Sequence, residues 1–235
     1  MKTEIFSKPI GESHPSVKKV LELAEEIMSK NKVLNIENLY NLAKKRLKIP
    51  RNGLLSIIQF LINKKILIEG SKFSRETVLL NHIRKRILNY IKANLGVHFS
   101  DLRKAALPEE MGSSGQLVWH LEMLLKFNYI KKIKVGNYTV FLPADLDKEE
   151  GKIHFLLRDR ISNMIISLLN EEDGVNKSEI TKKISEKRED IYYRLNNLLG
   201  YNILIETPDK SIAINPKKKK IISDLFQKSK LYMEK

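Results

Sequence analysis

The side chains best suited to recognising another molecule are amides and hydroxyls at the start of an expected helix. Ser113, Ser114 and Gln116 open this helix, and Trp119 follows on the same outward side. A glutamine amide can pair with the N6 and N7 edge of adenine. These four residues are therefore candidate contacts to base edges in duplex DNA. In the alternative interpretation a serine only caps the helix and Trp119 packs in the core.

Cationic side chains follow on an expected β-hairpin. Lys131, Lys132 and Lys134 lie on its first strand, and Asn137 lies at its tip. Ammonium groups on such a hairpin are placed to contact a phosphate strand. Lysines also occur on solvated edge strands, where they prevent strand pairing, and this is the alternative.

Two further cations occupy the same place in other parts of the chain. Arg51 and Arg188 each stand at the start of an expected helix and are candidate phosphate contacts. Glu189 and Asp190 follow Arg188 and would repel phosphate, so they suit a helix N-terminus better. The basic run from Lys217 to Lys220 is either an anion site or a solvated helix start.

Catalytic chemistry has no comparable candidates. There are no cysteines, and the five histidines are far apart and without metal-ligand spacing. The ten glycines form no phosphate-cradling loop, and His120 is expected to pack in the core. We therefore expect no catalytic residues, no metal site, no cofactor and no enzymatic activity.

Composition favours a polyanionic partner. Lysine and arginine total 43 against 28 acidic residues, a formal net charge of +15. Nucleic acid and an anionic membrane surface are the partners that such a charge favours, although an AT-rich genome also enriches lysine. No apolar stretch approaches the roughly 20 residues of a membrane span, and Met1 to His14 is no secretory signal. We expect a cytoplasmic protein without a transmembrane segment.

One sequence motif occurs three times along the chain: a helix end with two apolar residues, a short turn and a β-rich run. It begins at Leu61, Leu124 and Leu198, which are 63 and 74 positions apart. Around each copy of this repeated motif we expect three helices followed by a two-stranded hairpin, which is the winged helix-turn-helix arrangement. The fold class predicted is mainly α with small β-hairpins (α+β), built from tandem winged helix-turn-helix units.

The apolar spacing and turn residues predict the elements of each unit. Arg75 to Ala93 is expected to be one helix, as is Ile153 to Leu169, and Ser100 is expected to cap a short helix. Gly136-Asn137 is expected to close the best-defined hairpin. The predicted divisions are an N-terminal tail (1–14), unit 1 with a reduced wing (15–74), unit 2 (75–145), unit 3 (152–215) and a basic C-terminal helix (216–235).

Residues 82–142 resemble the winged helix-turn-helix transcriptional regulators common in archaea. The resemblance rests on Arg84-Lys85-Arg86-Ile87-Leu88, on Gly96 to Leu102, on Gly115 to Leu121 and on the wing Lys131 to Phe141. Family members show a similar glycine-valine-histidine-phenylalanine start to helix two and an aromatic-histidine-leucine in helix three. Leu107 to Gly112 departs from the pattern as a longer, more acidic turn.

The sequence therefore predicts a non-catalytic DNA-binding protein, a transcriptional regulator that contacts duplex DNA through its middle winged helix. The flanking units would stabilise the middle unit or dimerise it, so a homodimer or a protein partner is expected beside the duplex DNA. The alternative is a tandem winged-helix adaptor, similar to ESCRT-II subunits or polymerase accessory factors, that binds proteins and not DNA. An adaptor would expose an apolar patch on a third helix.

Overall fold

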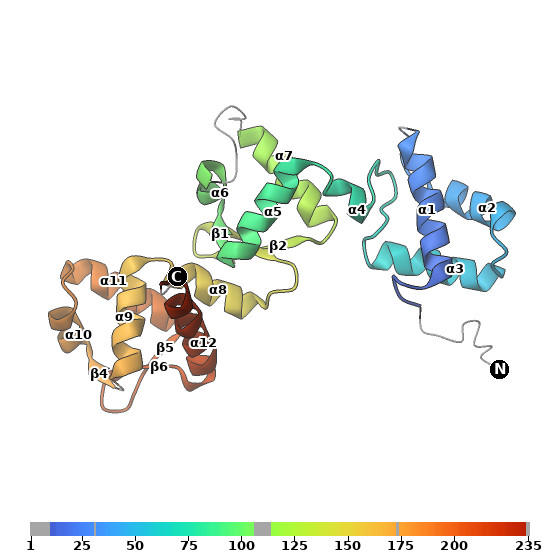
Figure 1. The fold of residues 1–235 in the computed structure, drawn as a ribbon. Helices are drawn as coiled ribbons and strands as arrows, with labels where there is room; N and C mark the ends of the chain where they lie inside the picture. Colours follow the sequence, from blue (N-terminus) through green and yellow to red (C-terminus); the bar gives the residue numbers. More distant parts are fainter. Residues whose placement is uncertain (1–9, 31, 106–113, 173, 234–235) are drawn as a thin grey trace, which may run out of the picture. The chain divides into compact units, whose positions relative to one another are not determined.

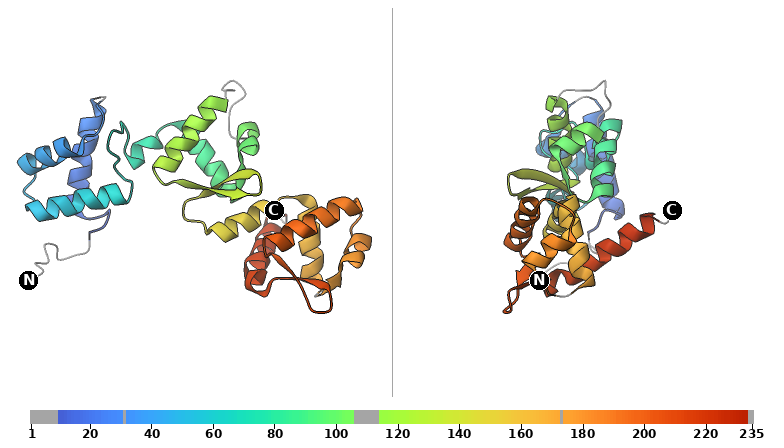
Figure 2. Two further views of the ribbon diagram at one scale, coloured as in Figure 1. Left: turned by 180° about the vertical axis from the view of Figure 1, so that it is seen from behind. Right: turned by 90° about the vertical axis from the view of Figure 1, so that its left-hand side faces the viewer.

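The computed structural model describes residues 10–30, 32–105, 114–172 and 174–233, and these are helical with two small antiparallel sheets (Figures 1 and 2). This confirms the predicted α+β class with small hairpins. The elements, in chain order, are α1 (Pro15–Ser29), α2 (Ile36–Arg46), α3 (Arg51–Asn63), α4 (Arg75–Val78), α5 (His82–Asn94), β1 (Val97–His98), α6 (Phe99–Ala105), α7 (Ser114–Lys126), β2 (Ile130–Val135), β3 (Tyr138–Pro143), α8 (Lys148–Leu157), α9 (Arg160–Glu171), β4 (Val175–Asn176), α10 (Lys177–Lys183), α11 (Arg188–Gly200), β5 (Leu204–Glu206), β6 (Ser211–Ile214) and α12 (Pro216–Met233).

The chain forms two compact units. The first contains the described parts of 1–90 and 103–130, and the second contains 91–102 and the described parts of 131–235. The winged-helix segment 82–142 contributes to both units, with α7 in the first and most of its hairpin in the second. The division into three winged-helix units stays a prediction.

In the first unit, helices α1 to α3 enclose an apolar core. Leu54, Ile57 and Leu61 on one face of α3 pack with α1 and α2 and are almost fully buried. Their spacing of three and four residues is that of one helical face, which is why this stripe could be predicted. No strand forms among residues 64–74, so the wing expected to be reduced here has no sheet.

In the second unit, α9 to α11 and the sheet β4-β6-β5 share another core. Ile165 of α9, Ile191 of α11 and Ile212 of β6 are fully buried within it. The hairpin β5–β6 pairs Leu204 with Ile214 in antiparallel register. This hairpin follows α11 as the sequence predicted.

The hairpin of the middle segment gains a third strand. The sheet order is β1-β3-β2, with Val97 opposite Phe141 and His98 opposite Val140. The two-residue strands β1 and β4 were not predicted, since two residues show no alternation that distinguishes a strand from a loop. The other strands, β2–β3 and β5–β6, form the hairpins expected after the third helices α7 and α11.

Two helices predicted to be continuous are broken. The expected helix from Arg75 to Ala93 is α4 and α5, because Asn81 Oδ1 accepts from the N–H groups of Ile83 and Arg84 at 3.1 Å and starts a new helix.

The expected helix from Ile153 to Leu169 is also two helices, α8 and α9. Asp159 caps the second, because its Oδ1 accepts from the Ser162 N–H at 2.9 Å. The prediction of Ser100 as a cap was wrong too: Ser100 lies inside α6, and its N–H donates to His98 Nδ1 at 3.3 Å.

The repeated motif has the same backbone geometry in all three copies. The residue four positions after the first leucine of the motif has a left-handed φ in each copy: 54° at Lys65, 57° at Asn128 and 54° at Asn202. The next N–H donates back to the carbonyl of Leu61, Leu124 or Leu198 at 2.9 Å in each case. This six-to-one bond and left-handed residue form a Schellman-type helix end that turns the chain toward the following run.

Candidate nucleic-acid interface

The third helices are equivalent in length and phase. Helices α3, α7 and α11 have 13 residues each, and each begins ten residues before its repeated leucine. The predicted site residues Arg51, Ser114 and Arg188 are the first residues of these helices, and all three are exposed. Three residues predicted separately thus occupy one structural position.

One face of α7 is apolar and points into the core. Leu117, Leu121 and Leu124 are buried, whereas Ser114 and Gln116 lie on the exposed side of the first turn. An exposed hydroxyl and amide at a helix start can reach a base edge when the helix enters the major groove. Ser113 and the turn Leu107 to Gly112 lie outside the described residues.

His120 packs in the interior, as predicted. His120 is 5 % exposed, and the equivalent residue of α3 is the fully buried Ile57. Burial lowers the pKa of His120, and the nearby positive charge of Arg84 and His82 lowers it further. A neutral, buried imidazole is not available to contact a phosphate.

Trp119 is half exposed, at 50 %, and does not pack in the core as one interpretation had it. One face of its ring contacts the guanidinium of Arg84 on α5, whose Cζ lies 5.2 Å from the ring centroid. The His120 ring lies against it edge to face, at 4.9 Å between centroids. The exposed part can therefore make contacts while Arg84 and His120 hold the indole in place.

Apolar side chains are exposed next to the polar ones. Leu55 of α3 and Val118 of α7 lie at equivalent positions, and Tyr193 of α11 is equivalent to Trp119. Such groups can contact thymine methyls or bases, or the surface of another protein. Aligning the three helices on the repeated leucine would have identified these positions from the sequence.

The three wing lysines divide between the two faces of β2. Lys132 and Lys134 are exposed on one face, whereas Lys131 lies on the other, because successive side chains of a strand alternate. Lys131 Nζ donates to the Ala144 carbonyl at 3.1 Å, and Lys134 Nζ donates to Thr139 Oγ1 at 2.8 Å. Lys132 and Lys134 are therefore the pair able to face one phosphate strand together.

The wing tip lies beside other parts of the second unit. Gly136 takes the left-handed φ of +56° that the turn needs, and a Cβ there would lie 3.4 Å from Tyr201 Oη. The exposed Asn137 lines a cavity of about 520 Å³, which is also lined by residues of α8, α9 and α11. The inner face of the hairpin packs on Phe155 and Tyr201.

Arg188 engages its own helix. Its guanidinium lies over the Tyr192 ring, with Cζ 5.3 Å from the centroid, and Nη2 donates to Tyr192 Oη at 3.4 Å. Both groups are on the first turn and a half of α11, next to Glu189 and Asp190. The carboxylates reduce the positive potential that Arg188 brings to this helix start.

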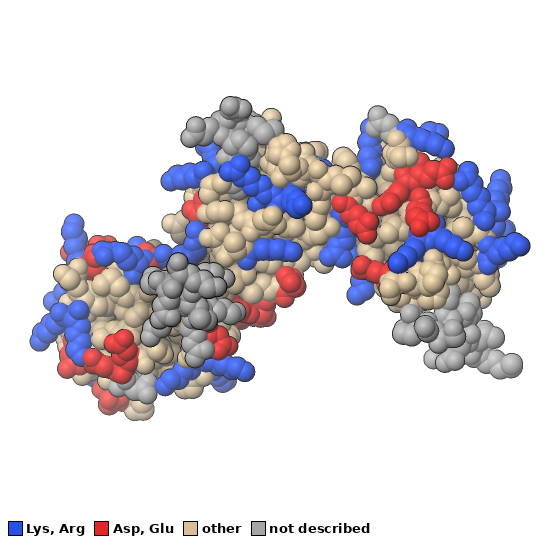
Figure 3. All heavy atoms as spheres, in the orientation of Figure 1, with Lys and Arg blue, Asp and Glu red and all other residues tan. Residues whose placement is uncertain are grey.

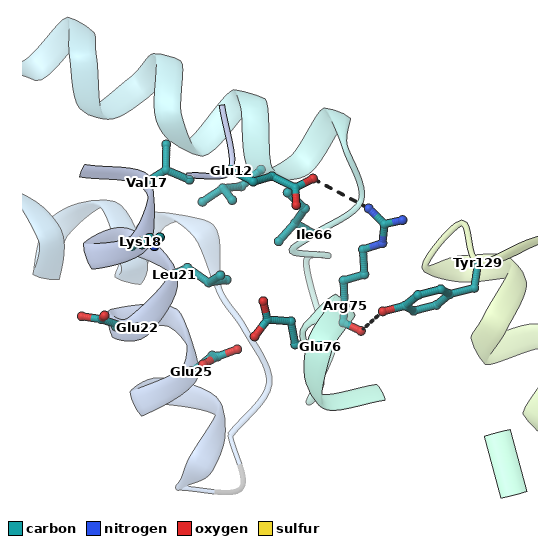
Figure 4. Close-up of a pocket in the computed structure, with 11 residues that line it drawn as sticks. Glu12, Val17, Lys18, Leu21, Glu22, Glu25, Ile66, Arg75, Glu76 and Tyr129 are labelled. Atoms are coloured by element: carbon teal, nitrogen blue, oxygen red, sulfur yellow. Dashed lines mark hydrogen bonds and ion pairs between the residues drawn. The ribbon is translucent and has the colours of Figure 1, made fainter. Parts of the chain in front are cut away.

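An acidic face lies on α1 (Figure 3). It surrounds a cavity of about 500 Å³ with carboxylates of Glu12, Glu22, Glu25 and Glu76 at its rim (Figure 4). Arg75 lies 3.8 Å from Glu12, and Tyr129 Oη donates to the Arg75 carbonyl at 2.7 Å. Carboxylates repel phosphate, so this face of α1 is unsuited to contact DNA.

The described part of the chain offers neither a metal site nor a membrane span. No group of three or more His, Asp or Glu side chains could hold a metal ion there. Within the same residues, no helix has the length and hydropathy needed to cross a bilayer.

Comparison with known proteins places the middle segment among helix-turn-helix domains. Residues 81–153 match the family model of an N-terminal HTH domain. The chain is also 32 % identical over 152 residues to a protein of Methanocaldococcus jannaschii named as an uncharacterized HTH-type transcriptional regulator. The matched region is 64 % of this chain and 37 % of that protein, so the chain spans little more than a third of the relative's length. These matches confirm the resemblance of residues 82–142 to archaeal winged helix-turn-helix regulators.

Proposed function

Since residues 81–153 are a helix-turn-helix domain, we propose that this protein is a non-catalytic regulator that binds duplex DNA through its middle winged helix. The observation that carries the proposal is the first turn of α7, where Ser114 and Gln116 are exposed on a helix of the recognition type. The net charge of +15 supports a polyanionic partner.

In this proposal α7 and the wing have different roles. Gln116, with Ser114 and Trp119, contacts base edges and so distinguishes one site from another. Lys132 and Lys134 neutralise phosphates, which adds affinity for every sequence alike. Arg51 and Arg188 are placed to make equivalent phosphate contacts from α3 and α11, and Arg188 is weakened by its acidic neighbours.

The experiment compares two variants by titrating duplexes of different sequence over a range of salt. Replacing Lys132 and Lys134 with alanine should weaken binding to all duplexes equally. It should also make the slope of log affinity against log salt shallower by about 0.9 for each lost contact. Gln116→Ala should leave the salt slope unchanged and lose about 1–3 kcal/mol of discrimination between sites.

A matched control changes the same amount of charge elsewhere. Lys18 and Lys19 are exposed on α1, outside the third helices and the hairpins, and their double alanine variant should keep the wild-type slope. If the Lys132/Lys134 pair and Gln116 can both be replaced in a folded protein without any change in DNA binding, the middle winged helix is not the DNA-binding surface.

The exposed apolar groups Val118 and Trp119 of α7 favour a second function, the tandem winged-helix adaptor. An adaptor would lose its protein partner on Val118→Glu and would show no salt-dependent affinity for DNA. The regulator should instead lose DNA affinity on this substitution, because a carboxylate on the groove-facing side repels phosphate.

A further inference from the structure

Arg84 of α5 is an unusual buried cation. The residue is 3 % exposed, and within the described part of the chain its Nη1 is buried without a hydrogen-bond partner. Its Nε donates to the Val78 carbonyl at 2.5 Å. Burial lowers the pKa of Arg84, but an arginine stays charged in a protein. A buried, charged donor without an acceptor is costly, which is a reason to ask what it binds.

Two aromatic rings lie close to this guanidinium, whose buried Nη1 has no hydrogen-bond partner among the described residues. The Arg84 Cζ lies 5.2 Å from the ring centroid of Phe73 and 5.2 Å from that of Trp119. Rings satisfy the charge in part but accept no in-plane hydrogen bond. The in-plane fork of a guanidinium matches a carboxylate, which accepts two parallel bonds from it.

A cavity of about 420 Å³ lies next to Arg84, and all of its lining belongs to the first compact unit. Its apolar lining comes from Met28 of α1, Phe73 and Leu80. Leu80 lines the cavity and is 82 % exposed, so part of the apolar lining faces solvent. The volume lies in the range of small-molecule sites.

The charged groups around the cavity favour a small anion. Arg84 and Lys72 line it, together with one carboxylate, that of Glu25, which accepts a hydrogen bond from Ser74 Oγ at 2.8 Å. A ligand with a single carboxylate at Arg84 and an aliphatic body against Met28, Phe73 and Leu80 would satisfy the buried donor and fill the apolar part.

We propose that this cavity is the binding site of a small aliphatic monocarboxylate, with Arg84 as its anchor, and that occupancy is transmitted to α7 through Trp119. A carboxylate at the edge of Arg84 draws the guanidinium toward the cavity and weakens its contact with the Trp119 ring. Since Trp119 lies on α7, the effector would lower affinity for DNA. This second step rests on the proposed DNA binding, whereas the ligand site does not.

The chain contains one tryptophan, so its fluorescence reports directly on the Arg84 contact. We would titrate the full chain with 4-methylpentanoate and with its neutral amide, by fluorescence and by calorimetry, in the absence of DNA. The acid should saturate and shift the emission, and the amide should bind at least tenfold more weakly, because it cannot form the charged fork. Equal binding of acid and amide, or no saturation up to roughly 10 mM, would overturn the site.

Variants test the assignment to Arg84. Arg84→Lys should weaken the acid at least tenfold while keeping the charge, since an ammonium lacks the planar fork. Leu80→Glu needs no change in the core because Leu80 is exposed, so it keeps the test decisive if Arg84→Lys fails to fold. It should weaken the acid several-fold by charge repulsion, whereas Leu55→Glu, at an exposed apolar residue of α3 that does not line the cavity, should not. If Leu80→Glu and Leu55→Glu behave alike, the site is elsewhere.

The coupling to DNA has its own measurement. Saturating 4-methylpentanoate should weaken duplex binding at least threefold, and the duplex should weaken the acid by the same factor. Acid binding without any effect on DNA affinity would overturn the coupling and leave the site. Absence of DNA binding at all would refute the proposed function, while the fluorescence titration would still decide the site.

Discussion

Lys65 should be the least favourable of the three left-handed residues that end α3, α7 and α11. It has a φ of 54° where the other two ends have Asn128 and Asn202. A left-handed conformation costs about 1–2 kcal/mol for a residue with a Cβ, and asparagine tolerates it better than lysine. Glycine removes this strain but adds roughly 0.5–1 kcal/mol of chain entropy to the unfolded state. Lys65→Gly should therefore stabilise the end of α3 by roughly 0.5–1 kcal/mol.

Amide hydrogen exchange measures this locally. The Ile66 N–H donates to the Leu61 carbonyl at 2.9 Å, so its protection reports on the helix end. A gain of roughly 0.5–1 kcal/mol slows its exchange about two- to fivefold. Lys64→Gly is the matched control, because Lys64 is right-handed (φ −79°) and glycine should there speed exchange by a similar factor. Equal effects of the two substitutions would refute the argument from backbone strain.

Three further predictions concern the folded units. Asp159→Asn keeps the cap of α9 but loses the charge pair with Arg194 at 3.1 Å. It should therefore lower the unfolding free energy by about 1 kcal/mol at neutral pH, measured by urea unfolding. Burial raises the pKa of Asp159, but hydrogen bonds from Arg194 and Ser162 outweigh it and lower the pKa. The pair's contribution is thus full above the unfolded pKa of about 3.9 and disappears as the pH falls through the folded pKa, where variant and wild type should converge. Because the pKa of His120 is lowered, its neutral side chain contributes fully to the unfolding free energy above about pH 6.5 and contributes less as the pH falls. In His120→Leu the unfolding free energy should therefore fall less between about pH 7 and 5 than in the wild type, measured by Trp119 fluorescence. Gly151→Ala should destabilise by about 1–3 kcal/mol despite alanine's helix propensity, because a Cβ would lie 2.5 Å from Cδ1 of the buried Leu142; an unchanged melting curve would contradict this.

The sequence was sufficient for the features that depend on local periodicity. Leu117, Leu121 and Leu124 recur at helical spacing, and Gly136-Asn137 separates two β-prone runs, so α7 and the hairpin β2–β3 could be placed closely. The breaks before α5 and α9 were missed, although Asn81 and Asp159 are residue types that start helices. Uninterrupted apolar spacing across each break outweighed that signal.

Tertiary contacts account for most of the rest. Nothing near Arg84 in the chain indicates that Phe73 and Trp119 will lie against it, because Phe73 comes from the segment before α4 and Trp119 from α7. The shared face of Lys132 and Lys134, with Lys131 on the other, follows from strand alternation and is predictable together with the strand. Strands of two residues, β1 and β4, form because β3 and β6 offer a free edge, which the sequence of the short strands does not indicate.

The proposed DNA binding can be measured by titrating the full chain against duplex DNA, RNA of the same sequence and anionic vesicles, each at several salt concentrations. The duplex should bind most tightly, and log affinity should fall linearly with log salt, with a slope of about −0.9 for each phosphate contacted. Affinity for the duplex that does not respond to salt, or binding to vesicles without binding to DNA, would contradict the proposed DNA binding.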